Sequence, residues 1–168
     1  MRTNCHTDGN TAFGGPFFYG HATRFSEKAE HAGNVWWHQS ELANELYSTF
    51  SPQQKHEALL NNSPKDKSTT VIFKDKSEKA AGLSIAKMNS SQKMLVHRTI
   101  NSLLTNFNEK NASEADRLLR MNGGIESLCI AYYQAGDTGG DQIWDRWRLE
   151  GPGFIWYFRG SPHVHAWV

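Results

Sequence analysis

The sequence predicts an α+β domain in which central helices pack on a C-terminal antiparallel β-meander. Between residues 34 and 121, apolar side chains recur every three or four positions, which is the spacing of one helix face. From residue 128 to residue 168 the spacing changes to two, as in strands whose side chains alternate between the faces of a sheet. Short glycine-containing turns separate the alternating runs, and connections this short join antiparallel neighbours.

The size and composition of the chain favour one domain over residues 1–168. A length of 168 residues fits a single hydrophobic core. Only 38% of the residues are apolar, but the chain has 9 Phe, 6 Trp and 5 Tyr. Because each large ring buries about 150–250 Å², these aromatic residues are enough to build that core.

The charge balance and the N-terminus argue against several classes of partner. The chain has 18 basic and 17 acidic residues, which predicts no positive surface for nucleic acid or an anionic membrane. No apolar run approaches the roughly 18 residues of a membrane span, and the N-terminal segment lacks the apolar core of a signal peptide. Cys5 and Cys129, far apart in the chain, make no disulfide framework. As written, the chain is expected to be cytoplasmic.

The first fifty residues predict a short strand followed by a helix. Glycines divide residues 1–33 into segments without a helical period, and the aromatic run at residues 17–19 is typical of a buried strand. Asn34 suits the N-cap of a helix. The apolar positions that follow it lie on one helix face: Val35, Trp36, Leu42, Ala43, Leu46, Tyr47 and Phe50.

A capping box marks the start of the second predicted helix. Ser51 suits the N-cap, Pro52 the first helical position, and Gln54 the third, where its side chain can reach back to the N-cap. This helix is expected to extend to about Leu60. The lysine-rich stretch that follows contains one short apolar run at residues 71–73, which is typical of an edge strand flanked by charges.

Two more helices are predicted before the sheet. A serine at position 90 or 91 caps the first of them, and its apolar stripe is Val96, Ile100, Leu103, Leu104 and Phe107. Ser113 starts the second, shorter helix, which the glycine pair at residues 123–124 ends. Four strands then follow, at residues 128–133, 145–150, 154–159 and 163–168.

Four strings of residues, spread in order over most of the chain, resemble a bacterial family described only as a domain of unknown function, DUF3500. They are TAFGGP at residues 11–16, YGH at 19–21, GNVW at 33–36 and the long aromatic string WDRWRLEGPGFIWYFRGSPHVHAWV at 144–168. Members of that family are longer at the N-terminus and often begin with an export leader. The resemblance therefore implies a shortened form with exported relatives, and it implies no activity.

A His-x-His pair on a predicted edge strand at the C-terminus, His163 and His165, is the most pointed functional signal. Residues i and i+2 of a strand face the same side, so both imidazoles can reach one metal ion. Imidazole suits zinc, copper, nickel or iron, and such sites need a third ligand. His21, in a glycine-rich loop, is the preferred third ligand, ahead of His31 and His38. The alternative is two histidines hydrogen-bonded at a sheet surface.

Two other polar clusters offer weaker hypotheses. The acidic loop at residues 137–141, with Asp145 nearby, has oxygen ligands that suit Ca²⁺, or it is an ordinary hairpin turn. Arginines on adjacent predicted strands can hold a ligand carboxylate or carbonyl in a bidentate grip, with Glu150 as a general base. The same residues can instead form structural cross-strand pairs beside tryptophans. The arginines are Arg146, Arg148 and Arg159.

The leading functional hypothesis is a metal-dependent hydrolase that acts on a small ester or lactone. His21, His163 and His165 would hold a divalent ion, with zinc or copper favoured, while Glu150 moves the proton and Arg159 orients the substrate. The aromatic residues between 144 and 167 would line an apolar pocket for the small-molecule substrate. One alternative is a copper-dependent oxidative enzyme with the same histidines. The other is a non-enzymatic ligand- or partner-binding module that uses an aromatic sheet face. The oligomeric state stays open.

Overall fold

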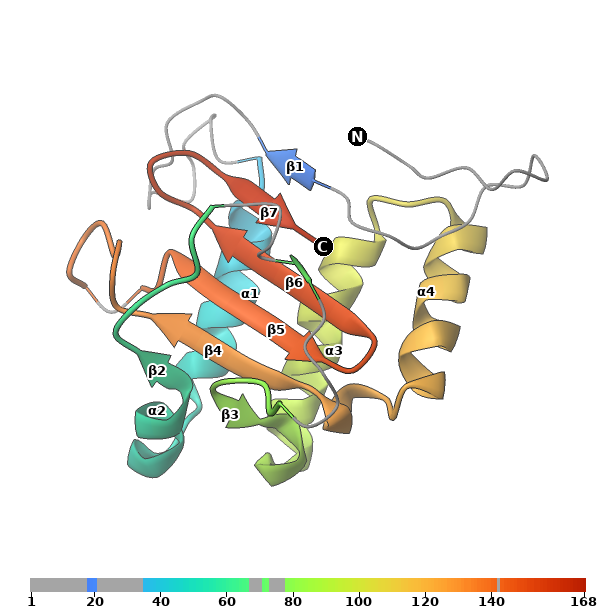
Figure 1. Cartoon of the computed structure of the whole chain (residues 1–168), viewed down its shortest axis with the longest axis horizontal. Helices are drawn as coiled ribbons and strands as arrows, with labels where there is room; N and C mark the ends of the chain where they lie inside the picture. The colour runs from blue at the N-terminus through green and yellow to red at the C-terminus, as the bar shows by residue number, and fades with distance from the viewer. Residues whose placement is uncertain (1–17, 21–34, 67–70, 73–77, 142) are drawn as a thin grey trace.

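A mixed sheet backed by helices confirms the predicted α+β class (Figure 1). This computed structural model describes residues 18–20, 35–66, 71–72, 78–141 and 143–168. The strands are ordered β1-β7-β6-β5-β4-β2, with β3 pairing with β4 beside that path. The pairing is antiparallel except between β2 and β4. The strands are β1 Phe18–Gly20, β2 Leu59–Leu60, β3 Leu83–Ser84, β4 Cys129–Tyr133, β5 Arg146–Gly151, β6 Phe154–Arg159 and β7 His165–Trp167.

The helices lie between β1 and β4 in the chain, and α1 and α3 cover one face of the sheet (Figure 1). They are α1 Trp37–Ser48, α2 Pro52–Ala58, α3 Ser90–Leu104 and α4 Glu109–Met121, with single 3₁₀ turns at Ile85–Lys87 and Ile125–Ser127. The predicted N-cap of α1, Asn34, lies outside the described residues. In the described ranges, no helix has the length and the apolar run needed to cross a bilayer.

The second predicted helix, α2, is confirmed at its start and wrong at its end. The Ser51 hydroxyl accepts a hydrogen bond from the backbone N–H of Gln54 at 3.2 Å. The Gln54 side chain accepts one in return from the Ser51 N–H at 3.0 Å. The helix stops at Ala58, because Leu59 and Leu60 leave it and pair in parallel with β4.

Asparagines, and not the predicted serines, cap the next two helices. Asn89 accepts a hydrogen bond from the N–H of Gln92 at 2.9 Å, so α3 begins directly after it. Asn108 accepts one from the N–H of Asn111 at 2.9 Å, which starts α4 one turn before the predicted Ser113. Asparagine and serine cap equally well, so the sequence pattern alone did not separate them. The two glycines after α4 have positive φ, as predicted for its end.

Two strand predictions need correction. Val71 and Ile72 belong to no strand, and the third residue of that predicted edge strand lies outside the described ranges. The C-terminal run does form β7, but β7 is no edge, because β1 pairs along its outer side with Phe18 opposite Trp167. The strand also begins at His165, so His163 precedes it in a bend.

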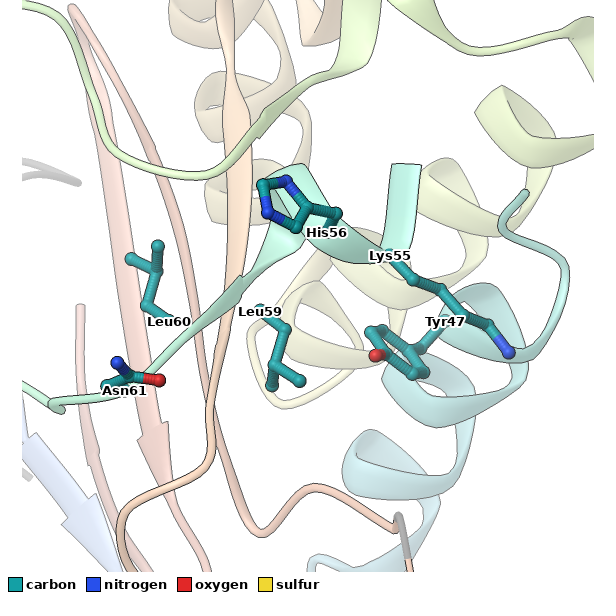
Figure 2. Close-up of a pocket in the computed structure, with 6 residues that line it drawn as sticks. All are labelled: Tyr47, Lys55, His56, Leu59, Leu60 and Asn61. Carbon is teal, nitrogen blue, oxygen red and sulfur yellow. The ribbon is translucent and has the colours of Figure 1, made fainter. Parts of the chain in front are cut away.

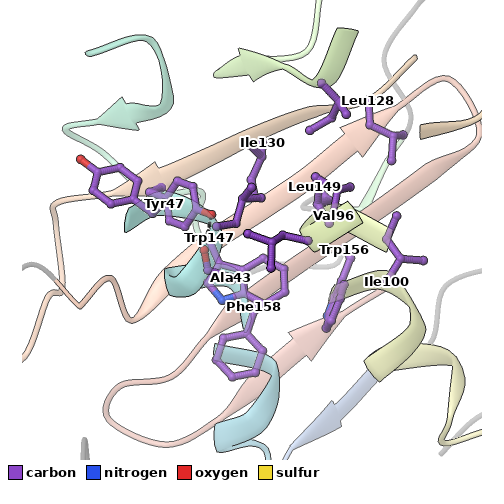
Figure 3. Close-up of a cluster of buried hydrophobic side chains, with 14 of the residues drawn as sticks. Ala43, Tyr47, Val96, Ile100, Leu128, Ile130, Trp147, Leu149, Trp156 and Phe158 are labelled. Carbon is purple, nitrogen blue, oxygen red and sulfur yellow. Dashed lines mark hydrogen bonds between the residues drawn. The ribbon is translucent and has the colours of Figure 1, made fainter. Parts of the chain in front are cut away.

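The hydrophobic core lies between the sheet and α1 and α3 (Figure 3). Trp147 of β5 is completely buried at its centre, stacked on Phe158 with ring centroids 5.2 Å apart. The same indole meets Trp156 edge-to-face at 4.5 Å. Because side chains alternate along each strand, the residues next to these in sequence project from the opposite face of the sheet. That opposite face carries the polar and charged groups of β4 to β7.

Candidate functional site

The sheet face opposite α1 and α3 gathers most of the residues that the sequence analysis singled out. We call it the arginine face. The pairing places Arg146 opposite Arg159 and Arg159 opposite His165, so these three residues form one row across β5, β6 and β7. The arginine face consists of Tyr133, Arg146, Arg148, Glu150, Tyr157, Arg159, His165 and Trp167, together with His163 and Phe18 at its edge.

The two histidines lie side by side, as the sequence analysis predicted. The ring centroids of His163 and His165 are 4.5 Å apart, with the ring planes inclined at 71°. The His165 ring also meets the edges of Phe18 at 5.1 Å and Trp167 at 5.4 Å. Arg159 donates a hydrogen bond from Nη2 to the backbone oxygen of His163 at 3.3 Å, which ties the bend before β7 to β6.

The surroundings of His165 keep its imidazole neutral at neutral pH. Partial burial, the positive charge of Arg159 and the neighbouring His163 together lower the pKa of His165 to about 4, with burial the largest cause. Asp66 acts on the same pKa in the opposite sense but more weakly. A neutral imidazole keeps a free lone pair, which a metal ligand or a proton acceptor requires.

The lowered pKa predicts a loss of stability in weak acid. The unfolded chain takes up a proton at His165 near pH 6.5 and the folded chain only near pH 4. Stability is therefore expected to fall as the pH drops through that window. Urea unfolding of metal-free protein at pH 7.0 and pH 4.5 measures the effect. The drop in midpoint should be smaller for His165→Gln than for the wild type and for the control variant His97→Gln. An equal drop in all three proteins would contradict the assignment.

Arg159 is held in place by a carboxylate that the sequence analysis missed. Its Nη1 atom forms an ion pair with Asp66, and its guanidinium lies over the ring of Trp167, 5.9 Å from the centroid. The Arg159 side chain is 9% exposed and that of Asp66 34%. Asp66 lies within a polar segment without a motif, so no local signal in the sequence marked it.

Glu150 is not brought to the histidine pair. Its carboxylate forms an ion pair with Arg148 at 3.0 Å. By sheet pairing it lies four residues along β5 from Arg146 and two strands from His165. Ordinary sheet spacings put the Cα atoms of Glu150 and His165 roughly 15 Å apart. A general base must lie within hydrogen-bonding reach of the proton it removes, so Glu150 is badly placed to serve this pair.

The third ligand of the predicted metal site lies outside the described residues. This is true of His21 and also of His31, whereas His38 is on α1 and therefore behind the opposite face of the sheet. Gly20, which directly precedes His21, is paired with His165 between β1 and β7. Among the described residues, no group of three or more His, Cys, Asp or Glu side chains is arranged to hold a metal ion.

That finding also covers the acidic loop considered for calcium, apart from residue 142, which is not described. Asp145 is completely buried and accepts a hydrogen bond from the backbone N–H of Thr138 at 2.9 Å. Burial and the charge of Asp141 raise the pKa of Asp137. Asp141 itself caps the following turn by accepting from the N–H of Ile143 at 2.9 Å. These contacts are typical of an ordinary loop.

A hollow of about 500 Å³ lies away from the arginine face, between the end of α1, α2 and β2 (Figure 2). One wall combines Tyr47 with the ammonium group of Lys55, which lies 5.4 Å from the ring centroid. Among the described residues that line the hollow, His56 is the one imidazole and none carries a carboxylate. The hollow therefore lacks the paired groups that metal binding or acid–base chemistry needs.

A family model matches nearly the whole of this chain. The model of the family described as "Protein of unknown function (DUF3500)" matches residues 1–167. No curated protein and no solved structure matches the chain. The match covers nearly the whole sequence, including every residue of the arginine face, and it assigns no chemistry to any of them.

Proposed function

We propose that this chain, which belongs to the DUF3500 family, is a metal-dependent hydrolase that acts on a small ester or lactone. The observation that carries the proposal is the placement of the His163 and His165 rings 4.5 Å apart, beside a buried arginine. Two imidazoles on one side of the chain form the start of a metal site of the kind that leaves a position open for water or substrate.

The third ligand in this proposal is His21. Its support is the pairing of Gly20 with His165, because the next Cα atom along the chain lies only about 3.8 Å beyond Gly20. Three imidazoles are a ligand set that zinc and copper accept in catalytic sites. When bound, the ion would polarise a carbonyl group and activate water.

The remaining roles follow from the contacts of the described residues. Arg159 is anchored on Asp66 and on the backbone oxygen of His163, so its guanidinium is fixed beside the histidine pair, where it orients a carbonyl or carboxylate. Asp66, and not Glu150, is the described carboxylate whose charge acts on His165, so we assign it the movement of the proton. Trp167 and Phe18, with rings 5.4 Å apart, offer an apolar wall to the rest of the substrate.

A non-enzymatic ligand-binding module is the second candidate, and the aromatic part of the same face favours it. Phe18 is 45% exposed, although it is a large apolar side chain. It lies next to Trp167, whose other neighbour Tyr157 is stacked on it at 5.4 Å. Exposed rings supported by buried ones are a common platform for a ligand. A copper-dependent oxidative enzyme would use the same three histidines and differ in the metal and the reaction.

A hydrolysis assay distinguishes these candidates. Protein loaded with Zn²⁺ or Cu²⁺ is tested on a panel of p-nitrophenyl esters and γ- and δ-lactones, before and after chelation. Because a catalytic metal supplies several kcal/mol of transition-state stabilisation, His163→Ala and His165→Ala are each expected to lower kcat/KM about 100-fold or more. His97→Ala, an exposed histidine of α3, serves as the control. Turnover that survives chelation and both substitutions would refute the metal-dependent mechanism.

A further inference from the structure

Arg146 carries a positive charge for which the described part of the chain provides no carboxylate. Its Nη1 atom donates to the Ser63 hydroxyl at 2.9 Å, and its Nε atom is buried without a hydrogen-bond partner. The guanidinium lies directly against Gly136, where even an added Cβ would come within 2.4 Å of it. Gly136 also has φ +90°, a backbone conformation that residues with a side chain rarely adopt. Both the close contact and the backbone conformation therefore disfavour any other residue at this position. The turn thus makes room for this guanidinium.

Two described carboxylates, Glu150 on the arginine face and Asp66 from a loop beside it, are already paired with the other two arginines. Glu150 pairs with Arg148, and Asp66 pairs with Arg159. Asp137, in the turn next to Gly136, does not take this role, because its buried Oδ1 atom has no hydrogen-bond partner, and burial and the charge of Asp141 raise its pKa. Among the described residues this face therefore has three guanidinium groups and two carboxylates.

The excess charge is costly as the protein stands. An arginine side chain stays protonated in proteins. Arg146 is half-buried, and a charge partly removed from water without a counter-charge destabilises a fold. Pairing places Arg146 directly opposite Arg159 on the same face, where like charges repel each other. An anion bound at Arg146 would remove both penalties.

We propose that Arg146 binds the carboxylate group of a small organic acid. The guanidinium fork matches a planar carboxylate in a bidentate arrangement. Aromatic rings of the same face lie nearby: the buried Tyr133 and Tyr157 are in edge-to-face contact at 6.2 Å, and Trp167, which is partly exposed, is stacked on Tyr157. The exposed part of Trp167 offers an apolar surface that suits an organic body better than a free inorganic anion, which needs polar contacts on all sides.

This placement also names a substrate class for the hydrolase. Arg146, Arg159 and His165 occupy one row on three adjacent strands, so the Cα atoms of Arg146 and His165 are about 10 Å apart. A substrate held at Arg146 would carry its carboxylate within about that distance of the ester or lactone bond. As a statement about the substrate, the inference rests on the proposed hydrolase. As a statement about binding, it is independent of metal and turnover.

Calorimetric titration of metal-free protein with benzoate, benzamide and inorganic phosphate tests the binding. The wild type is expected to bind benzoate, and to bind benzamide and phosphate at least tenfold more weakly. Arg146→Gln should weaken benzoate binding at least tenfold. Arg146→Lys keeps the charge but loses the guanidinium fork, so its affinity for benzoate should lie between those of the wild type and Arg146→Gln. Arg98→Gln, on the exposed side of α3, is the matched control and should bind like the wild type.

Circular dichroism and thermal unfolding of each variant show whether it is folded. If Arg146→Gln fails to fold, Arg146→Lys alone decides the test by its weaker binding. Unchanged benzoate affinity in the Arg146 variants, tighter binding of phosphate than of benzoate, or no binding of benzoate by the wild type would overturn the inference. Because no metal is present, none of these results depends on the proposed hydrolase. Loss of the metal site would in turn leave benzoate binding intact.

Discussion

Arg159→Met is expected to lower the free energy of unfolding by about 3 kcal/mol. The substitution leaves Asp66 without the cation that pairs with it, and removing one partner of a buried ion pair costs about 3–5 kcal/mol. The lower end applies because the Asp66 side chain is still 34% exposed. The variant also loses the hydrogen bond to the backbone of His163 and the contact with Trp167. Urea unfolding at pH 7 measures the difference.

Two comparisons separate the ion pair from a general effect of losing an arginine. Arg98→Met removes an exposed arginine that pairs with Glu45 at 3.2 Å, and it should cost less than about 1 kcal/mol. Adding Asp66→Asn to Arg159→Met should recover part of the loss, because no uncompensated carboxylate then remains. If Arg159→Met were as mild as Arg98→Met, the assigned role of the Asp66 pair would be wrong.

Trp147→Ala is expected to have the largest effect on stability, about 3–5 kcal/mol. The indole is completely buried, stacked on Phe158 and in edge contact with Trp156, so alanine leaves a cavity between the sheet and its helices (Figure 3). Trp167→Ala provides the matched control. That ring lies on the arginine face and is partly exposed, so its loss should cost about 1–2 kcal/mol. Equal costs for the two tryptophans would contradict the division of the sheet into a core face and a site face.

The C-terminal strands could be predicted because their sequence pattern depends only on local geometry. Residues that alternate along β4, β5 and β6 separate cleanly into the core side, such as Trp147, and the site side, such as Arg148. The turn between β5 and β6 is short, so the two strands had to be antiparallel neighbours. The capping box of α2 could be predicted for the same reason, because it involves only Ser51 and Gln54, three residues apart.

The features that sequence analysis missed depend on contacts between distant segments. Leu59 and Leu60 continue a helical pattern, but they pair with a strand about seventy positions further along the chain, and this pairing ends α2. β7 was predicted to be an edge strand, but β1, which lies far away in the sequence, pairs along its outer side. Tertiary pairing of this kind overrides local preference.

Some residues of the candidate site could likewise be predicted from local sequence patterns, whereas others depend on contacts between distant segments. Arg159 and His165 could be placed together from the sequence, because a short turn joins β6 to β7 and alternation sets the face. His163 precedes β7 in a bend, where its backbone oxygen accepts a hydrogen bond from Arg159. The position of Glu150 away from them follows from the cross-strand register, which the sequence pattern left open. Asp66 reaches the site from a loop, and a loop carries no periodicity from which its direction could be inferred.

The most direct test of the metal site is the metal content of purified protein, measured by elemental mass spectrometry after incubation with Zn²⁺ or Cu²⁺ and removal of the excess. The wild type and the control variant His97→Ala are expected to hold close to one ion per chain. The folded double variant His163→Ala/His165→Ala should hold essentially none, and His21→Ala should hold much less than the wild type. Wild-type protein without stoichiometric metal, or a double variant that keeps it, would contradict the proposed site.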